Sequence, residues 1–292
     1  MSVVVPVFNG RAHLPEMLES VTQQTHHALD IVLVDGGSTD GSARWLDSCD
    51  DPRVRVIHRP QGTGAASNWT AACQQARGAF VKVLCQDDLL HPLAIERQLS
   101  DLQSHPSAVM AVARRDIVDA RGQTLLRRQG GAHLRMGEIR GDDAIRAAYL
   151  TGTNVLGEPL AVLFRYEPLM ACLPWNDMDP LMLDLEMYAR VARGRAIVVR
   201  NDSVGAFRVS TSSWSTRLAR EQVRQFSNWQ QTYADTAVPP PTWIERVRAN
   251  TGVRLRAALR RGAYRWLAVR GSLQSPPPAS ATALDDAQAP EH

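Results

Sequence analysis

The chain has 292 residues, of which 44% are hydrophobic, and its formal net charge is +3. This length accommodates one large α/β domain with an appendage, or two modest domains. Lys82 is the only lysine among 33 basic residues. Such a bias is more typical of genome composition than of nucleic-acid binding, so we expect no nucleic-acid partner.

Other bulk features favour a reduced, cytoplasmic protein. The four cysteines show no metal-ligand spacing, and a strand-like segment begins at Ser2 without a preceding signal sequence. No run approaches the roughly 20 apolar residues of a membrane span. We therefore expect a soluble protein that is at most peripheral to the inner face of a membrane.

Strands and helices alternate through the first 113 residues. The first strand begins at Ser2, and four more are predicted over 30–35, 53–57, 79–85 and 108–113, with helices over 14–24, 43–49, 65–76 and 93–106 between them. This alternation is typical of βαβ units, and it predicts an α/β fold with a mostly parallel, doubly wound sheet flanked by helices.

The second half of the chain is less regular. A hairpin is predicted around 119–122, a strand over 196–200, and helices over 141–150, 180–194, 216–234 and 243–270. The last helix carries eight arginines and one acid, Glu245. We predict a catalytic domain over 1–212, a basic helical extension over 213–271 and a disordered Pro- and Ala-rich tail over 272–292.

Polar residues and glycines gather where the predicted strands end. Ligands of open parallel sheets bind outside the carboxyl ends of the strands, so these segments are expected to line one cleft. They are Pro6, Val7 and Asn9 after the first strand, Asp35 after the second, Gly64 and Asn68 after the third, and Asp87 and Asp88 after the fourth.

Some of these residues have simpler interpretations. Asp35 precedes two glycines and could belong to a turn, and Asn68 could be a solvated helix residue. The stretch "GTGAAS" follows the third strand and lacks a final glycine, which excludes a dinucleotide fingerprint. Gly64 could still shape a phosphate-facing loop before a helix.

Asp87 and Asp88 raise a question of charge, because adjacent carboxylates repel each other. They could cap the helix that follows, since acids favour helix N-termini. They could equally hold Mg²⁺ or Mn²⁺, which bind through one or two carboxylates together with substrate phosphates.

Taken together, these motifs resemble family 2 glycosyltransferases of the glycosyltransferase A fold. The resemblance rests on "SVVVPVFNG", "DIVLVDGGSTDGS", "GTGAASNWTAACQQARGAFVKVLCQDDLLHP" and the strands between them, over about the first 115 residues. A weaker match continues to about residue 212. The resemblance implies inverting transfer of a sugar from a nucleotide-diphosphate donor to a saccharide or lipid-linked saccharide acceptor.

The resemblance also implies roles for single residues. Pro6, Val7, Asn9 and Asp35 would hold the nucleoside, Asp87 would lie against the ribose or the water shell of the metal, and Asp88 would bind Mg²⁺ or Mn²⁺. Asp184, in "LMLDLEMYARV", would be the general base. Its apolar neighbours would raise its pKa toward a useful value, although it could instead pair with Arg190 or Arg193 on the helix surface.

Two departures from the family pattern favour an alternative. Leu183 replaces a glutamate that usually precedes the base, and Ser210 replaces a histidine that often helps to hold the metal. A catalytically inactive nucleotide-sugar sensor or scaffold is therefore the alternative function. A nucleotidyltransferase is disfavoured, because no lysine-bearing phosphate loop follows the first strand.

Two further regions have open interpretations. Asn154 and Glu158 could line the acceptor side or belong to a polar loop. The basic helix over 243–270 could lie on an anionic membrane or pack onto the catalytic domain.

Overall fold

The computed structural model describes residues 1–131, 133–210, 216, 218 and 220–273. The predicted disordered tail, apart from its first two residues, lies outside this range. The strands are β1 (Ser2–Val7), β2 (Asp30–Asp35), β3 (Val54–His58), β4 (Phe80–Val83), β5 (Leu89–Leu90), β6 (Ala108–Val118), β7 (Thr124–Gln129), β8 (Gly137–Arg140), β9 (Val162–Arg165) and β10 (Ala196–Arg208).

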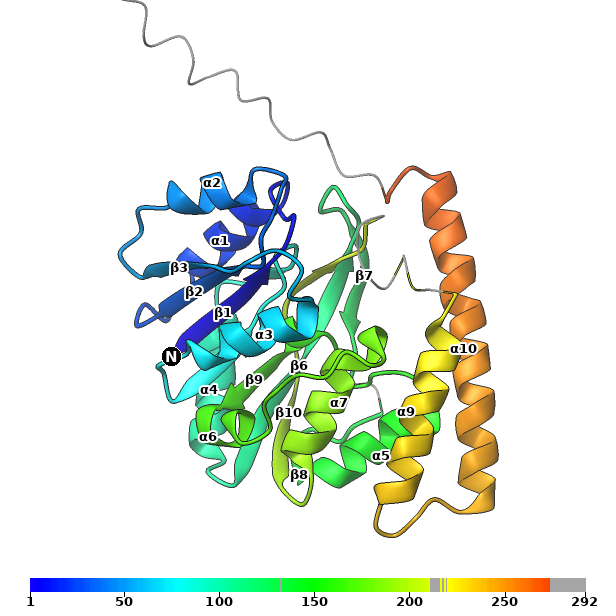
Figure 1. The fold of residues 1–292 in the computed structure, drawn as a ribbon. Helices are drawn as coiled ribbons and strands as arrows, with labels where there is room; N and C mark the ends of the chain where they lie inside the picture. Colours follow the sequence, from blue (N-terminus) through cyan, green and yellow to red (C-terminus); the bar gives the residue numbers. More distant parts are fainter. Residues whose placement is uncertain (132, 211–215, 217, 219, 274–292) are drawn as a thin grey trace, which may run out of the picture.

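The strands form one mixed sheet in the order β3-β2-β1-β4-β9-β6-β10-β5, with β7 beside β6 and β8 beside β10 (Figure 1). The pairs β3–β2, β2–β1 and β1–β4 are parallel, and so is β6–β10. The short strand β9 runs antiparallel to both β4 and β6 and joins the two parallel parts. The predicted α/β sheet with flanking helices is confirmed, and β9 is the element that makes it mixed.

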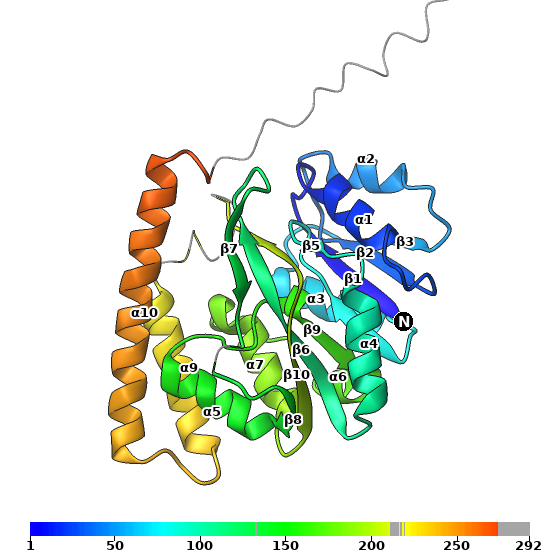
Figure 2. The same ribbon diagram turned by 180° about the vertical axis from the view of Figure 1, so that it is seen from behind.

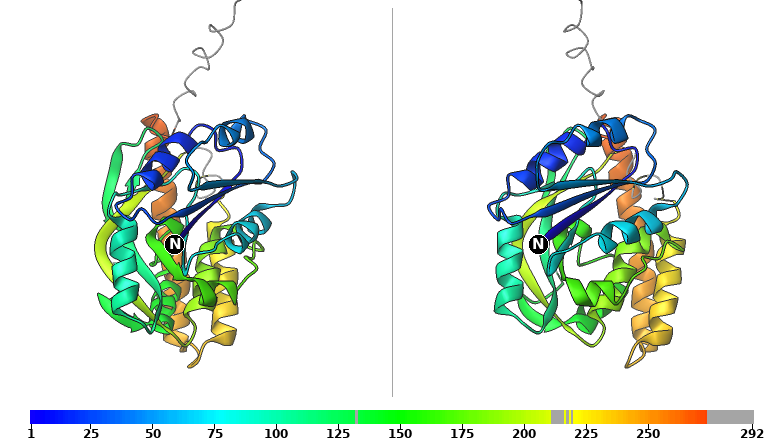
Figure 3. Two further views of the ribbon diagram at one scale, coloured as in Figure 1. Left: turned by 90° about the vertical axis from the view of Figure 1, so that its left-hand side faces the viewer. Right: turned by 60° about the vertical axis from the view of Figure 1, so that its left-hand side comes forward.

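Helices cover both faces of this sheet. They are α1 (Leu14–Thr22), α2 (Ser42–Asp47), α3 (Ala65–Gln74), α4 (Ala94–Ser104), α5 (Gly141–Thr151), α6 (Tyr166–Met170), α7 (Leu183–Ala192), α9 (Gln222–Thr236) and α10 (Trp243–Val269), with 3-10 turns η1 (Pro159–Ala161) and η2 (Pro180–Met182). In the right-hand view of Figure 3, α4 lies on one side of the sheet and α9 and α10 lie on the other.

The sheet has an apolar core on each side, and β1 contributes to both. Val3 and Val5 pack with α1 and α4, whereas Val4 packs with α3, α5 and α7 on the opposite face. This follows from the two-residue period of a strand. Because both faces are covered, β1 is a continuous apolar run, and its residues are all buried.

The two last helices, α9 and α10, pack against the catalytic elements. Gln230 Nε2 of α9 donates a hydrogen bond to the carbonyl oxygen of Tyr149 on α5, at 2.8 Å. Where α5 ends, Gly152 touches α10 so closely that a Cβ atom would lie 2.3 Å from Val253 N. The predicted helix over 243–270 is found over Trp243–Val269, and it begins with a capping box between Thr242 and Glu245.

None of the helices in the described ranges is both long enough and apolar enough to cross a lipid bilayer.

Candidate active site

The carboxyl ends of β1 and β2 lie side by side and are joined by hydrogen bonds. Val7 is paired in register with Asp35. The Val7 carbonyl oxygen accepts hydrogen bonds from Gly36 N at 2.8 Å and from Asn68 Nδ2 at 3.1 Å. Pro6 and Val7 are both buried, so any contact that they make with a nucleoside would have to use the backbone.

Asn68 is buried rather than solvated. Its Nδ2 also donates to the Val34 carbonyl oxygen at 3.1 Å, so one amide group connects the ends of β1 and β2. Its Oδ1 is buried and has no hydrogen-bond partner among the described residues. Gly64 caps α3 with φ +76°, a conformation that favours glycine.

Asp35 and Asn9 both hold the loop that follows β2. Asp35 is buried, and its Oδ1 accepts hydrogen bonds from the Ser38 backbone N at 3.2 Å and from Ser38 Oγ at 2.5 Å. Asn9 has φ +51°, and its Oδ1 accepts a 2.8 Å hydrogen bond from Thr39 N. These side chains therefore shape the loop, and their predicted contact with a nucleoside stays a prediction.

Gln86 fastens the end of β4 to the end of β1. Its Nε2 donates to the Phe8 carbonyl oxygen at 2.9 Å, and its Oε1 accepts from Phe8 N at 2.8 Å. The side chain lies so close to Gly10 that a Cβ atom there would be 2.4 Å from Oε1. Sequence reasoning missed this role, although Gln86 directly precedes the two aspartates.

Asp88 is fully buried, and one of its oxygens is available. Oδ1 accepts a hydrogen bond from the Arg208 backbone N at 3.1 Å, whereas Oδ2 has no partner within the described residues. The helix α4 begins after Leu93 without any side-chain cap, which excludes the alternative that Asp88 caps it. Burial, followed by the charge of Asp87, raises the pKa of Asp88 well above its usual value.

Arg208, at the end of β10, holds the turn that carries both aspartates. Its Nε donates to the Asp87 carbonyl oxygen at 3.0 Å, and its Nη1 donates to the Ala120 carbonyl oxygen at 3.2 Å. Its Nη2 forms an ion pair with Glu16 on α1 at 2.5 Å. A buried guanidinium thus fixes the backbone around Asp88, and the Asp88 Oδ2 atom remains free of hydrogen bonds from the described residues.

Asp184 lies in the first turn of α7, with both oxygens engaged. Oδ2 accepts a 3.0 Å hydrogen bond from Asn154 Nδ2, and Oδ1 accepts one from Leu185 N at 2.7 Å. Burial, and then the charge of Glu158, raise the pKa of Asp184 to about 7. Arg190 instead pairs with Glu186 at 2.7 Å, so pairing between Asp184 and Arg190 is excluded.

Glu158 and Arg115 form a buried ion pair beside Asp184. Arg115 Nη2 donates to Glu158 Oε1 at 2.9 Å, and Arg115 Nε donates to the other oxygen. Burial, the largest single influence, raises the pKa of Glu158, but the charge and hydrogen bonds of Arg115 together with smaller contributions outweigh burial, so this pKa is lowered. Glu158 is therefore an anion that raises the pKa of Asp184. Its ion pair with Arg115 was not expected from the sequence.

Cys85 is affected electrostatically by both groups of carboxylates. Burial raises the pKa of its thiol well above the usual value, and the charges of Asp88, Asp87, Asp184 and Glu158 raise it further. Cys85, which lies two residues before Asp87, is therefore within electrostatic reach of Asp184 and Glu158. The structure brings the predicted metal ligand and the predicted base to the same site.

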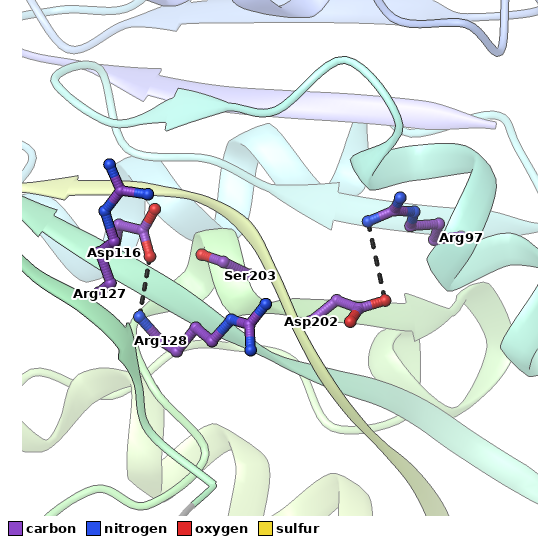
Figure 4. Close-up of a pocket in the computed structure, with 6 residues that line it drawn as sticks. All are labelled: Arg97, Asp116, Arg127, Arg128, Asp202 and Ser203. Carbon is purple, nitrogen blue, oxygen red and sulfur yellow. Dashed lines mark hydrogen bonds and ion pairs between the residues drawn. The ribbon is translucent and has the colours of Figure 1, made fainter.

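A separate pocket of about 220 Å³ lies near α4, and Figure 4 shows it. It shares no residue with the Asp88 site, and its lining combines three arginines with two aspartates. Arg97 lies 3.7 Å from Asp202, and Arg128 N donates to Asp116 Oδ1 at 2.8 Å. The pocket is lined by Arg97, Asp116, Arg127, Arg128, Asp202 and Ser203.

Across the described ranges, no three His, Cys, Asp or Glu side chains are close enough to form a metal centre by themselves. Ser210, the position where a histidine was expected from the resemblance, is fully buried. A metal at Asp88 would need further oxygen ligands from a bound phosphate or from water. This is the usual situation for Mg²⁺, which keeps waters and substrate phosphates in its shell.

The architecture is that of solved glycosyltransferases of the A type. Staphylococcus aureus TarS 1–349 in complex with UDP-GlcNAc superposes with a TM-score of 0.58 at 16% identity, over 77% of this chain and 65% of that one. The Pyrobaculum calidifontis mannosyltransferase PcManGT, in complex with GDP-Man and Mn²⁺, gives 0.57 at 17% identity, over 92% and 80%. At such low identity, these similarities establish the fold alone.

Sequence comparison establishes the family. The model of the family described as "Glycosyl transferase family 2" matches residues 2–165, and this chain belongs to that family. One relative is the putative teichuronic acid biosynthesis glycosyltransferase TuaG of Bacillus subtilis (strain 168), which is 30% identical over 110 residues. That match spans 37% of this chain and 44% of TuaG, so the two proteins share less than half of their lengths.

Proposed function

We propose that this protein transfers a sugar from a nucleotide-diphosphate donor to an acceptor hydroxyl with inversion at the anomeric carbon. The single observation that carries the proposal is the buried Asp88 carboxylate. One of its oxygens lacks a partner among the described residues, and it shares a centre with a second carboxylate, Asp184, whose pKa is about 7. Family membership supports the same reaction.

The donor would bind at the ends of β1, β2 and β4. Its nucleoside would lie against Pro6, Val7, Asn9 and Asp35, with Gly64 and Asn68 at the neighbouring helix N-terminus. Backbone amides at such a terminus suit phosphate groups. UDP-GlcNAc and GDP-Man are bound by the two solved neighbours, which supports a nucleotide sugar as the donor.

Asp88, with Asp87 close by, would hold a divalent ion, and the residues present fit one. A fully desolvated carboxylate with an available oxygen and a strongly raised pKa is costly unless a cation compensates it. Hard oxygen ligands suit Mg²⁺ or Mn²⁺. Such an ion, when bound, would neutralise charge that develops on the departing diphosphate.

Asp184 would act as the general base. It takes the proton of the acceptor hydroxyl, whose oxygen forms a bond to the anomeric carbon from the face opposite the diphosphate. The bond between the anomeric carbon and the diphosphate oxygen breaks, and the nucleoside diphosphate leaves with the electron pair. Asn154 fixes the orientation of Asp184, and burial, followed by the anion of Glu158, raises the pKa of Asp184 to about 7.

The product would belong to bacterial surface polysaccharide or glycolipid synthesis. The name of the relative TuaG, a putative teichuronic acid biosynthesis glycosyltransferase, supports this class of acceptor. Nucleoside diphosphate is a product of transfer and also of slow donor hydrolysis, so its release is a general measure of activity.

The test uses purified protein with a panel of nucleotide sugars, with Mn²⁺ or Mg²⁺ and with a chelator. We expect one donor to raise the melting temperature, since a ligand of the folded state stabilises it. We also expect slow release of nucleoside diphosphate from that donor, and loss of release with the chelator. Donor binding without any release in the presence of acceptor extracts would instead identify the inactive sensor.

A further inference from the structure

The outward face of α10 carries an apolar stripe. Val247, Leu255 and Leu259 are 58%, 59% and 60% exposed. At 100° per residue, these positions lie on the side of α10 opposite Ala249, Val253 and Ala257, which are buried against the rest of the protein. The outer stripe consists of Ile244, Val247, Leu255, Leu259, Trp266 and Val269.

The stripe lies at the outer edge of the molecule. Figures 1 and 2 show α10 as the outermost helix, with α9 and α5 on its inner side. Large apolar side chains gathered along one exposed helix face usually mark an interaction surface.

At 100° per residue, Arg254 and Arg265 lie along one edge of the stripe and Arg256 along the other, whereas Arg248 lies within it. Arg248, Arg254, Arg256 and Arg265 are all exposed. Glu245 is the only acid between residues 243 and 270, and it is bound to Arg146 at 2.8 Å and to Thr242. The outward surface of α10 therefore combines an apolar stripe with arginines that form no ion pair with the described residues.

The pattern of apolar residues and arginines favours one of two partners for the outer face of α10, a second copy of the chain or an anionic membrane. A second copy of α10 would bring arginines against arginines along the whole length of the helix, which disfavours self-association. An anionic lipid surface accepts the apolar stripe among its acyl chains and the arginines among its headgroups. We propose that α10 lies flat on an anionic membrane, with its outer stripe inserted at the interface.

Arg260, on the inner side of α10, lies within electrostatic reach of Glu158. The charge of Arg260 contributes to the lowered pKa of Glu158, after burial and Arg115. A docked α10 would thus place the acceptor side within roughly two helix diameters, about 20 Å, of the headgroups. If the proposed function holds, on which this step rests, the acceptor would be a lipid-linked saccharide.

The test measures sedimentation of the full chain with vesicles, without donor or acceptor. We expect binding to vesicles of equal parts phosphatidylglycerol and phosphatidylcholine, and little binding to phosphatidylcholine alone or in high salt. The double variant Leu255→Gln/Leu259→Gln should bind about tenfold or more weakly, because it removes apolar area from the stripe. Arg248→Gln should bind about fivefold more weakly.

Matched controls use exposed residues elsewhere. Leu126→Gln/Met136→Gln alters two exposed apolar residues that are not part of α10, and Arg44→Gln removes one exposed charge on α2. Both controls should bind like the wild type. Equal binding by the Leu255→Gln/Leu259→Gln variant overturns the proposal, as does a stable dimer that this variant separates and that binds no vesicles. Donor hydrolysis, assayed without vesicles, tests the proposed function separately.

Discussion

Asp88 and Asp184 are both buried carboxylates of one site, but their surroundings differ. Asp88 has one oxygen without a partner among the described residues, and both oxygens of Asp184 accept hydrogen bonds. The first arrangement leaves one carboxylate oxygen without a hydrogen bond from the described residues, and the second holds an oriented group whose pKa lies near 7. The difference indicates that two similar side chains are prepared for different chemistry by the groups around them.

The largest effect is expected from Asp88→Asn, which removes the charge and keeps the shape. If Asp88 holds the ion, kcat/KM should fall on the order of a thousandfold or more, since charge stabilisation by a metal amounts to several kcal/mol. The free energy of unfolding without metal should stay the same or rise, because a costly buried charge is gone. Steady-state kinetics and urea denaturation measure the two quantities.

Asp116→Asn is the matched control for that variant. Asp116 lines the pocket of Figure 4 and lies outside the candidate active site. The Asp116→Asn enzyme should retain nearly full activity. An Asp88→Asn enzyme that keeps its dependence on Mn²⁺ would show that Asp88 does not hold the ion.

Asp184→Asn is expected to lower kcat by about a hundredfold to ten-thousandfold, the range of general-base catalysis. Donor binding, measured by thermal stabilisation, should be unchanged, because the proposed mechanism assigns Asp184 to the acceptor hydroxyl and not to the donor. Glu186→Gln, two residues away and paired with Arg190, should change kcat less than about twofold, as expected for a surface ion pair. Unaltered turnover in Asp184→Asn would exclude its role as the base.

The pH dependence of kcat should report the pKa of Asp184. The active form is deprotonated, so the rate should rise with pH up to about 7 and then level off. Below this pKa, the rate should change about tenfold per pH unit.

Glu158→Gln should move this rise to lower pH. The substitution removes a negative charge that raises the pKa of Asp184, and it leaves the positive charge of Arg115 nearby. Both changes favour the anion of Asp184. A rise that stays in place in Glu158→Gln would show that a different group controls the rate.

The sequence was sufficient to predict the parallel part of the fold and the position of Asp87 and Asp88 after the fourth strand. Buried strands such as β1 and β2 are continuous apolar runs, and the polar residues that follow them must meet at one sheet edge. The strand β9 was missed because four residues between a 3-10 turn and a short helix give no periodic pattern. It pairs with β4 and with β6 in the antiparallel direction. Its place between these two strands could not be inferred from the parallel βαβ units.

Side-chain partners were harder to predict than positions. Arg208 and Asp88 are 120 residues apart, and Arg115 and Glu158 are 43 residues apart. No local spacing reveals such pairs. The alternative that Asp184 pairs with Arg190 is excluded, because Glu186 lies one turn away from Arg190 and forms the ion pair with it.

Lys82 links two segments of the candidate active site, the strand β4 that precedes Asp88 and the segment that follows Glu158. Its Nζ, on β4, donates to the carbonyl oxygens of Leu160 at 2.6 Å and Val162 at 3.2 Å, just after Glu158. It also donates to Gln98 Oε1 at 2.5 Å. Burial lowers the pKa of this ammonium group from 10.5 to about 7.

The smallest expected effect is on the pH dependence of stability. Between about pH 7 and 10.5 the unfolded chain binds a proton at Lys82 that the folded chain has lost, so the free energy of unfolding should rise with pH in this window. The contribution approaches about 1.4 kcal/mol per pH unit and vanishes below about pH 7, where both states are protonated. Lys82→Met should remove this slope, whatever its effect on stability at one pH.

Leu99→Met, a core substitution of similar volume on α4, should keep the slope of the wild type. Urea denaturation at several pH values measures the difference, and equal slopes in wild type and Lys82→Met would show that Lys82 stays protonated in the folded core, held by its three acceptor oxygens.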